Sequence, residues 1–316
     1  MLEAIFQLNT KNMHCKNVNT IKGGLVALLL LGGLSWTSCT DAGQTDESLT
    51  TVDNTVTQET QEQADRLKKI FFQIPSPVEM VTIIRESGAK YDHAVLNDVS
   101  NRNDYNTAKS KAINLGIYGA DLSYASVFNQ NQESIIYLSA AKQLADELGV
   151  SGAFSDETME RVESNLEDRD SLMHIITETF YELDAYLKEN DRSTISAQVI
   201  TGGWLEGLYL ASMMIESGVE DESLMDRLVD QKYALNDLIS LNEAYNQGGS
   251  LDGMLLDLNE LKVIFDNTRP KEIDNTQSVV NGKLVLGADS KLMLDQEDVD
   301  KIIVLAKDIR GKYVTS

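Results

Sequence analysis

The chain has 316 residues, of which 50 are acidic and 27 basic, and its formal net charge at pH 7 is -23. An acidic surface repels the phosphate backbone of nucleic acids, which proteins bind through clustered Lys and Arg, so we expect no nucleic-acid partner. The two cysteines, Cys15 and Cys39, are too few for a disulfide framework, and packing must supply the stability.

An uncharged, mostly apolar run at 24–34 follows three lysines near the start of the chain. Roughly 20 apolar residues are needed to cross a membrane, and this run is about half that long. It has the length of a signal-peptide core that follows a basic leader. We expect Met13, rather than Met1, to be the true start, because it leaves the shorter leader.

The residues LSWTSC at 34–39 follow this run. They resemble the lipobox of bacterial lipoproteins, although Trp36 stands where that pattern usually has leucine. The resemblance implies cleavage before Cys39, acylation of Cys39 with palmitate or a similar chain, and a place at the Gram-negative outer membrane facing the periplasm or the cell surface. An ordinary secretory signal or an uncleaved anchor is the alternative.

The next segment, 40–57, is rich in Thr and Asp and poor in large apolar side chains. It cannot bury enough apolar surface to offset the entropy of ordering, which favours a flexible tether. The predicted organisation is therefore a signal peptide at 1–38, an acidic tether at 39–57 and a single helical domain at 58–316.

The domain is predicted to be all-α, a globular array of about ten mostly antiparallel helices. Only three prolines occur, and none lies between Pro77 and Pro270, as expected of helix interiors. Apolar residues recur at intervals of three, four and seven. Gly149, Gly218 and Gly248 mark helix ends, and Ser155 or Asn131 could cap the next starts. The predicted helices cover 58–72, 78–87, 104–129, 132–148, 155–166, 170–189, 194–217, 221–246, 251–266 and 296–311.

One segment departs from the helical pattern. Residues 278–287, SVVNGKLVLG, place an Asn-Gly pair between β-branched and aliphatic residues, which is typical of a β-hairpin. We expect a small two-stranded hairpin there.

Three segments share a weak pattern of glycines, a leucine and an acidic residue, at 116–125, 202–211 and 248–257. Their unequal spacing matches no helical repeat family that we can name. The structural interpretation is that small residues allow helices to approach closely.

Asp121 and Glu206 lie within almost wholly apolar segments, where an ionised carboxylate is costly unless it is paired or hydrogen-bonded. Two interpretations stay open. A tyrosine hydroxyl could satisfy each carboxylate in the core, or both could line a groove that binds a sugar or a peptide or supplies an acid and a base. The candidate ligand-binding residues are Tyr118, Asp121, Tyr124, Trp204, Glu206 and Tyr209.

Other chemistry finds little support in the sequence. His174 and Glu178 are four residues apart, but no second such pair exists, and a solvated charged face explains them. We find no serine-nucleophile elbow, phosphate loop, zinc motif or calcium loop. We therefore predict no cofactor, no metal site and no catalytic residue of a known motif.

The sequence favours a non-enzymatic envelope lipoprotein that acts as a binding, adaptor or scaffold protein. Its partners would be the membrane, through the lipid anchor, and an envelope protein or glycan. The alternative is a carbohydrate- or peptide-binding or processing protein that uses the groove with Asp121 and Glu206.

Overall fold

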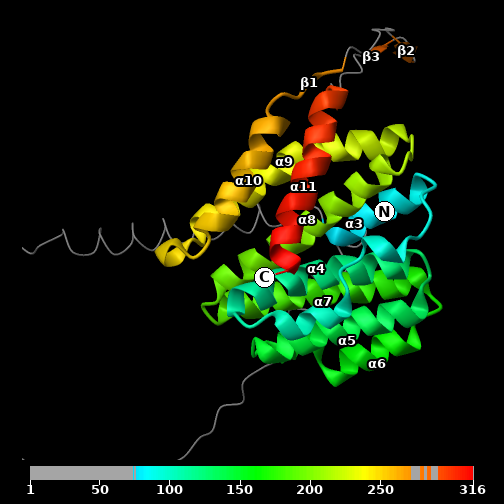
Figure 1. Ribbon diagram of the computed structural model, residues 1–316. Coiled ribbons are helices and arrows are strands. Elements are labelled where there is room, and N and C mark those ends of the chain that lie inside the picture. Colours follow the sequence, from blue (N-terminus) through cyan, green and yellow to red (C-terminus); the bar gives the residue numbers. More distant parts are fainter. Residues whose placement is uncertain (1–73, 75, 272–277, 281–282, 286–290, 316) are drawn as a thin grey trace, which may run out of the picture. The chain divides into compact units, whose positions relative to one another are not determined.

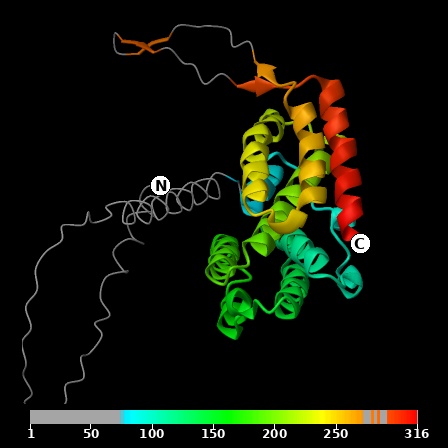
Figure 2. The same cartoon turned by 90° about the vertical axis from the view of Figure 1, so that its left-hand side faces the viewer.

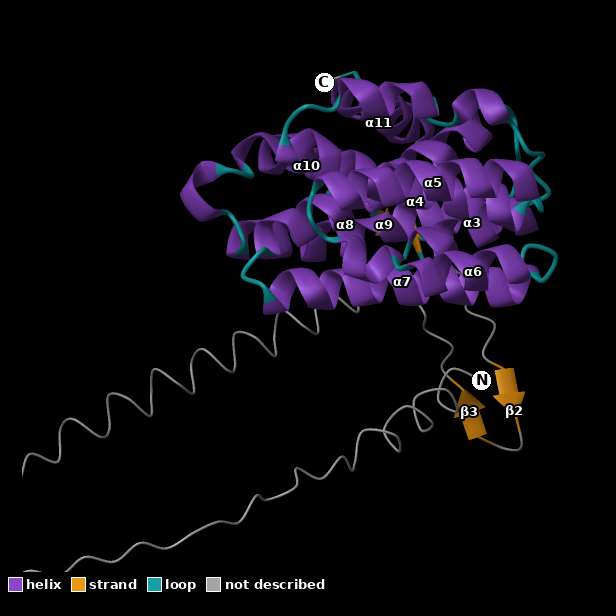
Figure 3. Ribbon diagram, turned by 90° about the horizontal axis from the view of Figure 1, so that it is seen from below, coloured by secondary structure: helices purple, strands orange, loops and turns teal. Residues whose placement is uncertain are grey.

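A computed structural model describes Ile74 and residues 76–271, 278–280, 283–285 and 291–315. The signal peptide, Cys39, the tether and the predicted helix at 58–72 lie outside the described residues. The described part is an all-α fold, as predicted, and strands are limited to short pieces (Figure 3).

The helices follow the predicted order closely. Their bounds are α3 Pro77–Glu86, α4 Ala108–Val127, α5 Asn131–Glu147, α6 Asp156–Ser164, α7 Arg169–Glu189, α8 Ser193–Glu216, α9 Glu222–Ala244, α10 Asp252–Phe265 and α11 Gln296–Val314. Short 3-10 turns lie between them at His93–Val95 (η1), Val99–Asp104 (η2), Ser151–Phe154 (η3) and Gln247–Gly249 (η4).

Helices α4 and α8 form the centre of the fold and share its largest interface. Almost every residue of α4 from Ser110 onward is buried, which fits a helix that is apolar on all sides. Helix α5 packs against α4, α7 packs against both α4 and α8, and α9 and α11 pack mainly against α8 (Figures 1 and 2). Helix α3 packs against α4, α8 and α9.

Two glycines let the backbones of α4 and α8 approach each other. A Cβ atom on Gly116 would lie 2.0 Å from the carbonyl oxygen of Val199, and one on Gly202 would lie 2.1 Å from that of Ile113. This agrees with the structural interpretation of the first two sequence segments. In the third segment, Gly248 lies in η4 at a φ of +60° and a Cβ there would meet nothing within 4 Å.

Several helix ends follow the predicted chemistry. Ser155 accepts a hydrogen bond from the backbone N–H of Thr158 and caps α6. Gly149 and Gly218 follow α5 and α8 with φ of +68° and +91°, which is the left-handed conformation that ends many helices.

Two predicted helix starts are wrong. Helix α4 begins at Ala108 rather than 104, because Thr107 and Ser110 form a reciprocal capping box and the residues before them form η2. Asn131 is the first residue of α5 and not its cap; the cap position is Gln130, which makes no side-chain capping bond.

The predicted hairpin is present in the strands that the structure describes. Strand β2 (Ser278–Val280) pairs antiparallel with β3 (Lys283–Val285), with Val280 opposite Lys283. A second short pair joins β1 (Arg269–Pro270) to β4 (Leu292–Met293). The Asn-Gly pair itself lies outside the described residues.

Replacing Gly116 or Gly202 by alanine should lower the free energy of unfolding by about 3 kcal/mol or more, because the new methyl group meets backbone atoms that cannot move independently. Urea unfolding measures this. Gly311→Ala in α11 is the matched control: nothing lies within 4 Å of its Cβ position. There the same change should stabilise the helix by up to about 1 kcal/mol. Equal effects at Gly116 and Gly311 would contradict the close approach.

Candidate functional site

Asp121 of α4 and Glu206 of α8 meet in the core. Both side chains are 0% exposed. Each residue lies little more than one helical turn beyond the glycine at the α4–α8 crossing, at about 3.6 residues per turn. The sequence therefore brings the two acids together through the same close helix contact.

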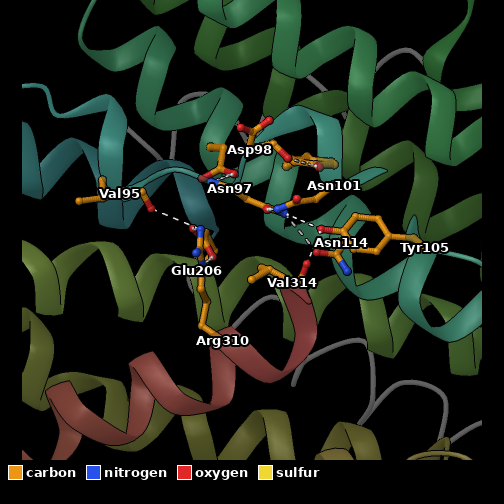
Figure 4. A network of polar contacts seen from close by, with 11 residues as sticks. Val95, Asn97, Asp98, Asn101, Tyr105, Asn114, Glu206, Arg310 and Val314 are labelled. Carbon is orange, nitrogen blue, oxygen red and sulfur yellow. Dashed lines mark hydrogen bonds and ion pairs between the residues drawn. The ribbon is translucent and has the colours of Figure 1, made fainter. Parts of the chain in front are cut away.

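Arg310 reaches this pair from α11. Its Nε donates to Oε2 of Glu206 at 3.0 Å, and its Nη2 donates to Oε1 at 2.9 Å, which makes a two-pronged ion pair (Figure 4). The same Nη2 donates to the carbonyl oxygen of Val95 at 3.3 Å. The guanidinium also lies over the ring of Tyr209, 4.4 Å from its centre. Such charge-assisted, two-pronged bonds fix the position of an arginine strongly.

Asp121 is less well satisfied. Its Oδ2 accepts the backbone N–H of Asn97 at 3.2 Å, whereas its Oδ1 has no hydrogen-bond partner among the described residues. Burial raises the pKa of Asp121 well above its usual value, and the charge of Glu206 raises it further, while Arg310 lowers it in part. Burial alone would lower the pKa of Arg310, but the Glu206 carboxylate outweighs it and raises that pKa, so the guanidinium stays charged.

A chain of polar side chains extends from Asn97 to the end of α11. The Asn97 amide donates to the hydroxyl of Tyr105 at 3.0 Å and to Oδ1 of Asn114 at 3.3 Å. Tyr105 then donates to the carbonyl oxygen of Val314 at 3.2 Å (Figure 4). Asn114 donates to the carbonyl oxygen of Tyr313 at 3.0 Å. These bonds tie the segment before α4, α4 itself and the last turn of α11 together.

Of the four aromatic candidates, Tyr209 contacts the cluster through Arg310, whereas the polar atoms of the other three bind elsewhere. The hydroxyl of Tyr118 donates to the carbonyl oxygen of Asp98 at 3.0 Å, and that of Tyr124 accepts the backbone N–H of Asp92 at 3.2 Å. Trp204 donates to Oε1 of Gln231 at 2.9 Å. The tyrosine partner expected for Asp121 is therefore replaced by a backbone amide, and neither acid is exposed to a groove.

Arg310 and Asn97 complete this cluster, and the sequence interpretation did not name them. The burial of Arg310 could have been predicted from its spacing to apolar residues of the same helix. It follows Ala306 by four residues and Ile303 by seven, so it lies on the apolar stripe of α11 and not on its solvated face. A charge on such a stripe indicates a buried partner. Asn97 lies in an irregular loop and offers no comparable signal.

An open pocket lies beside the same two helices, on the side of α7. It contains about 730 Å³ of empty space, including the solvent at its mouth. Its lining is mostly apolar and includes Gly116, Gly119, Phe180, Tyr181 and Ile200. The ring of Phe180 covers Gly119, where a Cβ atom would lie 2.2 Å from Cζ.

Several polar side chains that line this pocket have partners within the protein. Asp184 accepts the hydroxyl of Ser196 and, at 2.8 Å, the ammonium of Lys188. The hydroxyl of Thr177 donates to the carbonyl oxygen of Met173 at 2.9 Å. The pocket therefore offers a ligand mainly apolar contact.

No group of three or more His, Cys, Asp or Glu side chains within the described ranges could hold a metal ion. Glu178, which follows His174 by one helical turn, instead pairs with Arg161 at 2.6 Å. His93 lies 2.9 Å from Glu133, which also accepts the hydroxyl of Tyr91.

In the part of the chain that the structure covers, no helix combines the length and the apolar character needed to span a membrane. Comparison with models of known families, with curated proteins and with solved structures gave no match.

Replacing Arg310 by methionine should lower the free energy of unfolding by about 3 to 5 kcal/mol, because it leaves the buried Glu206 carboxylate without its cation. Chemical unfolding at neutral pH measures this.

The matched control is Lys307→Met, one turn earlier on α11. Lys307 pairs with Glu216 in a salt bridge whose side chains are 37% and 51% exposed. Its loss should cost below about 1 kcal/mol. If both variants lose the same stability, Arg310 is not the residue that holds α11 to the core.

Proposed function

We propose that this protein is a lipid-anchored, non-enzymatic binding protein of the bacterial envelope, and that its binding site is the pocket between α4, α7 and α8. The anchor is Cys39, and the location is the outer membrane, facing the periplasm or the cell surface. The pocket takes an uncharged, largely apolar group of a ligand or partner. The observation that carries the proposal is this open apolar pocket beside a core whose carboxyl groups, Asp121 and Glu206, are buried.

The residues that line the pocket favour binding of a ligand and not catalysis. Gly116 and Gly119 line it, so backbone atoms of α4 form part of its wall. Phe180 is half-buried and Tyr181 is 42% exposed, and aromatic side chains of this kind supply apolar contact area. Sites for small ligands usually have mostly apolar walls and few polar groups, and the lining of this pocket has that character.

The burial of Asp121 and Glu206 weighs against the carboxylate groove as the binding site. A catalytic or sugar-binding acid must reach its substrate within hydrogen-bond distance. Both side chains are 0% exposed, and Glu206 already binds Arg310 through both oxygens. No observation in the described residues favours that second function.

The acidic composition is consistent with attachment through lipid and not through charge. A net charge of -23 repels anionic headgroups, so the surface itself adds little attraction to the membrane. One acyl chain gives only marginal binding, and two or more on one cysteine would hold the protein firmly.

Cys39→Ala should release the protein from membranes, because it removes the site of acylation. Cell fractionation followed by immunoblotting measures the change. Cys15→Ala is the control and should leave the protein in the membrane fraction, since Cys15 lies before the proposed cleavage site. Retention of the Cys39 variant in membranes would remove the lipoprotein proposal.

Thr177→Trp should fill the pocket from the side of α7. Binding of the neutral fluorescent probe N-phenyl-1-naphthylamine should become at least about tenfold weaker, a loss near 1.4 kcal/mol. Tyr186→Trp, an exposed position on the same helix that does not line the pocket, should bind the probe like the wild type. Equal probe binding by both variants, with unchanged melting temperatures, would contradict the pocket as the binding site.

A further inference from the structure

We infer that Asp121 is protonated in the folded protein and donates its proton to Glu206, so that the cluster with Arg310 is electrically neutral and the hold on α11 depends on pH. This inference concerns how the fold is held together and is independent of the proposed ligand pocket.

Without a proton on Asp121, the two buried carboxyl groups have more hydrogen-bond acceptors than donors. Both oxygens of Glu206 accept from Arg310, and Oδ2 of Asp121 accepts from Asn97. Oδ1 of Asp121 has no donor in the described part of the chain. An ionised carboxylate only accepts, so two neighbouring carboxylates cannot bond to each other. A proton on Asp121 supplies the missing donor, and Glu206 is an acceptor within hydrogen-bonding reach.

The charges of the cluster also do not balance if Asp121 and Glu206 are both ionised. One guanidinium faces two buried carboxyl groups, which leaves one negative charge without a partner if both acids are ionised. The other titratable groups that face Asp121 are the tyrosines at positions 105, 118, 137 and 209, and burial raises the pKa of each, so they are neutral. Like charges at close range in a dry site cannot both persist, and one acid then keeps its proton.

The direction of the pKa shift agrees with this arrangement. Burial is the largest cause of the raised pKa of Asp121, and the neighbouring Glu206 is the next. The proton is placed on Asp121 because both oxygens of Glu206 already accept hydrogen bonds from Arg310, whereas Oδ1 of Asp121 has no partner in the described residues.

The pH dependence follows from the raised pKa. An aspartate in the unfolded chain has a pKa of about 4. Between that value and the raised pKa of folded Asp121, the folded protein holds one proton that the unfolded chain has released. The folding equilibrium constant therefore falls about tenfold for each pH unit in this window. The stabilisation is complete below pH about 4 and is lost as pH rises through the folded pKa.

The test is urea unfolding of the full chain between pH 5 and 8 for the wild type and Asp121→Asn. The asparagine amide can donate to Glu206 and its carbonyl can accept from Asn97, which imitates the protonated acid at every pH. We expect the ratio of the wild-type to the variant folding constant to fall with pH, by up to about tenfold per unit. A constant ratio would overturn the inference.

Asp257→Asn is the matched control. Asp257 is also buried and also holds α11, but it has a cation of its own in Lys312, together with the hydroxyl of Tyr313. Asp257→Asn should lower the free energy of unfolding, but its folding constant should fall with pH as that of the wild type does, because Asp121 is still present. A control that loses that dependence as completely as Asp121→Asn would also overturn the inference.

A second measurement stands even if Asp121→Asn does not fold. In protein labelled with ¹³C at the aspartate carboxyl carbon, one signal should remain at the protonated position at pH 6.5, and the same signal should titrate at a lower pH in Glu206→Gln, because one of the two causes of the raised pKa is removed. The glutamine removes the neighbouring charge and leaves Asp121 as the only acid beside Arg310. Absence of a protonated signal that responds to Glu206→Gln would contradict the proton on Asp121.

Discussion

The close contact between the backbones of α4 and α8 is the constraint on which the rest of the structure depends. Gly116 and Gly202 remove the two side chains that would hold the helices apart, so carbonyl oxygens come within reach of the opposite Cα atoms. The same contact places Asp121 beside Glu206, and the open pocket lined by Gly116 and Gly203 lies at this crossing too. The buried charges and the open apolar site are therefore two results of one helix crossing.

Local chemistry explains why so much of the fold could be predicted. Apolar spacing gave helix positions to within a few residues, and Gly149 and Gly218 marked two ends because glycine adopts a positive φ without strain. The start of α4 was missed because Thr107 and Ser110 cap each other's backbone, and either residue is also common inside polar helix turns. Such reciprocal bonds are not apparent from apolar spacing alone.

The groups that bind Asp121 and Glu206 could not be predicted from local sequence patterns. Glu206 and Arg310 are 104 residues apart in the chain, and Asp121 receives its hydrogen bond from the backbone of Asn97, whose side chain gives no hint of it. The pocket was missed because its walls come from α4, α7 and α8, and each helix alone shows an ordinary apolar face. Sequence patterns indicated that two carboxylates lie in apolar segments. Only the packing of separate helices shows which groups pair with them or donate hydrogen bonds to them.

The position of Arg310 late in the sequence bears on the order in which the protein can form. Until α11 is synthesised, Glu206 lacks the guanidinium of Arg310, and Tyr105 and Asn114 lack the carbonyl oxygens that they bind near residue 314. At that stage the Glu206 carboxylate must stay hydrated, although it is buried in the folded protein. Closure of the core is thus tied to the arrival of the last helix, and a nascent chain should be a good substrate for proteases and chaperones until α11 has packed.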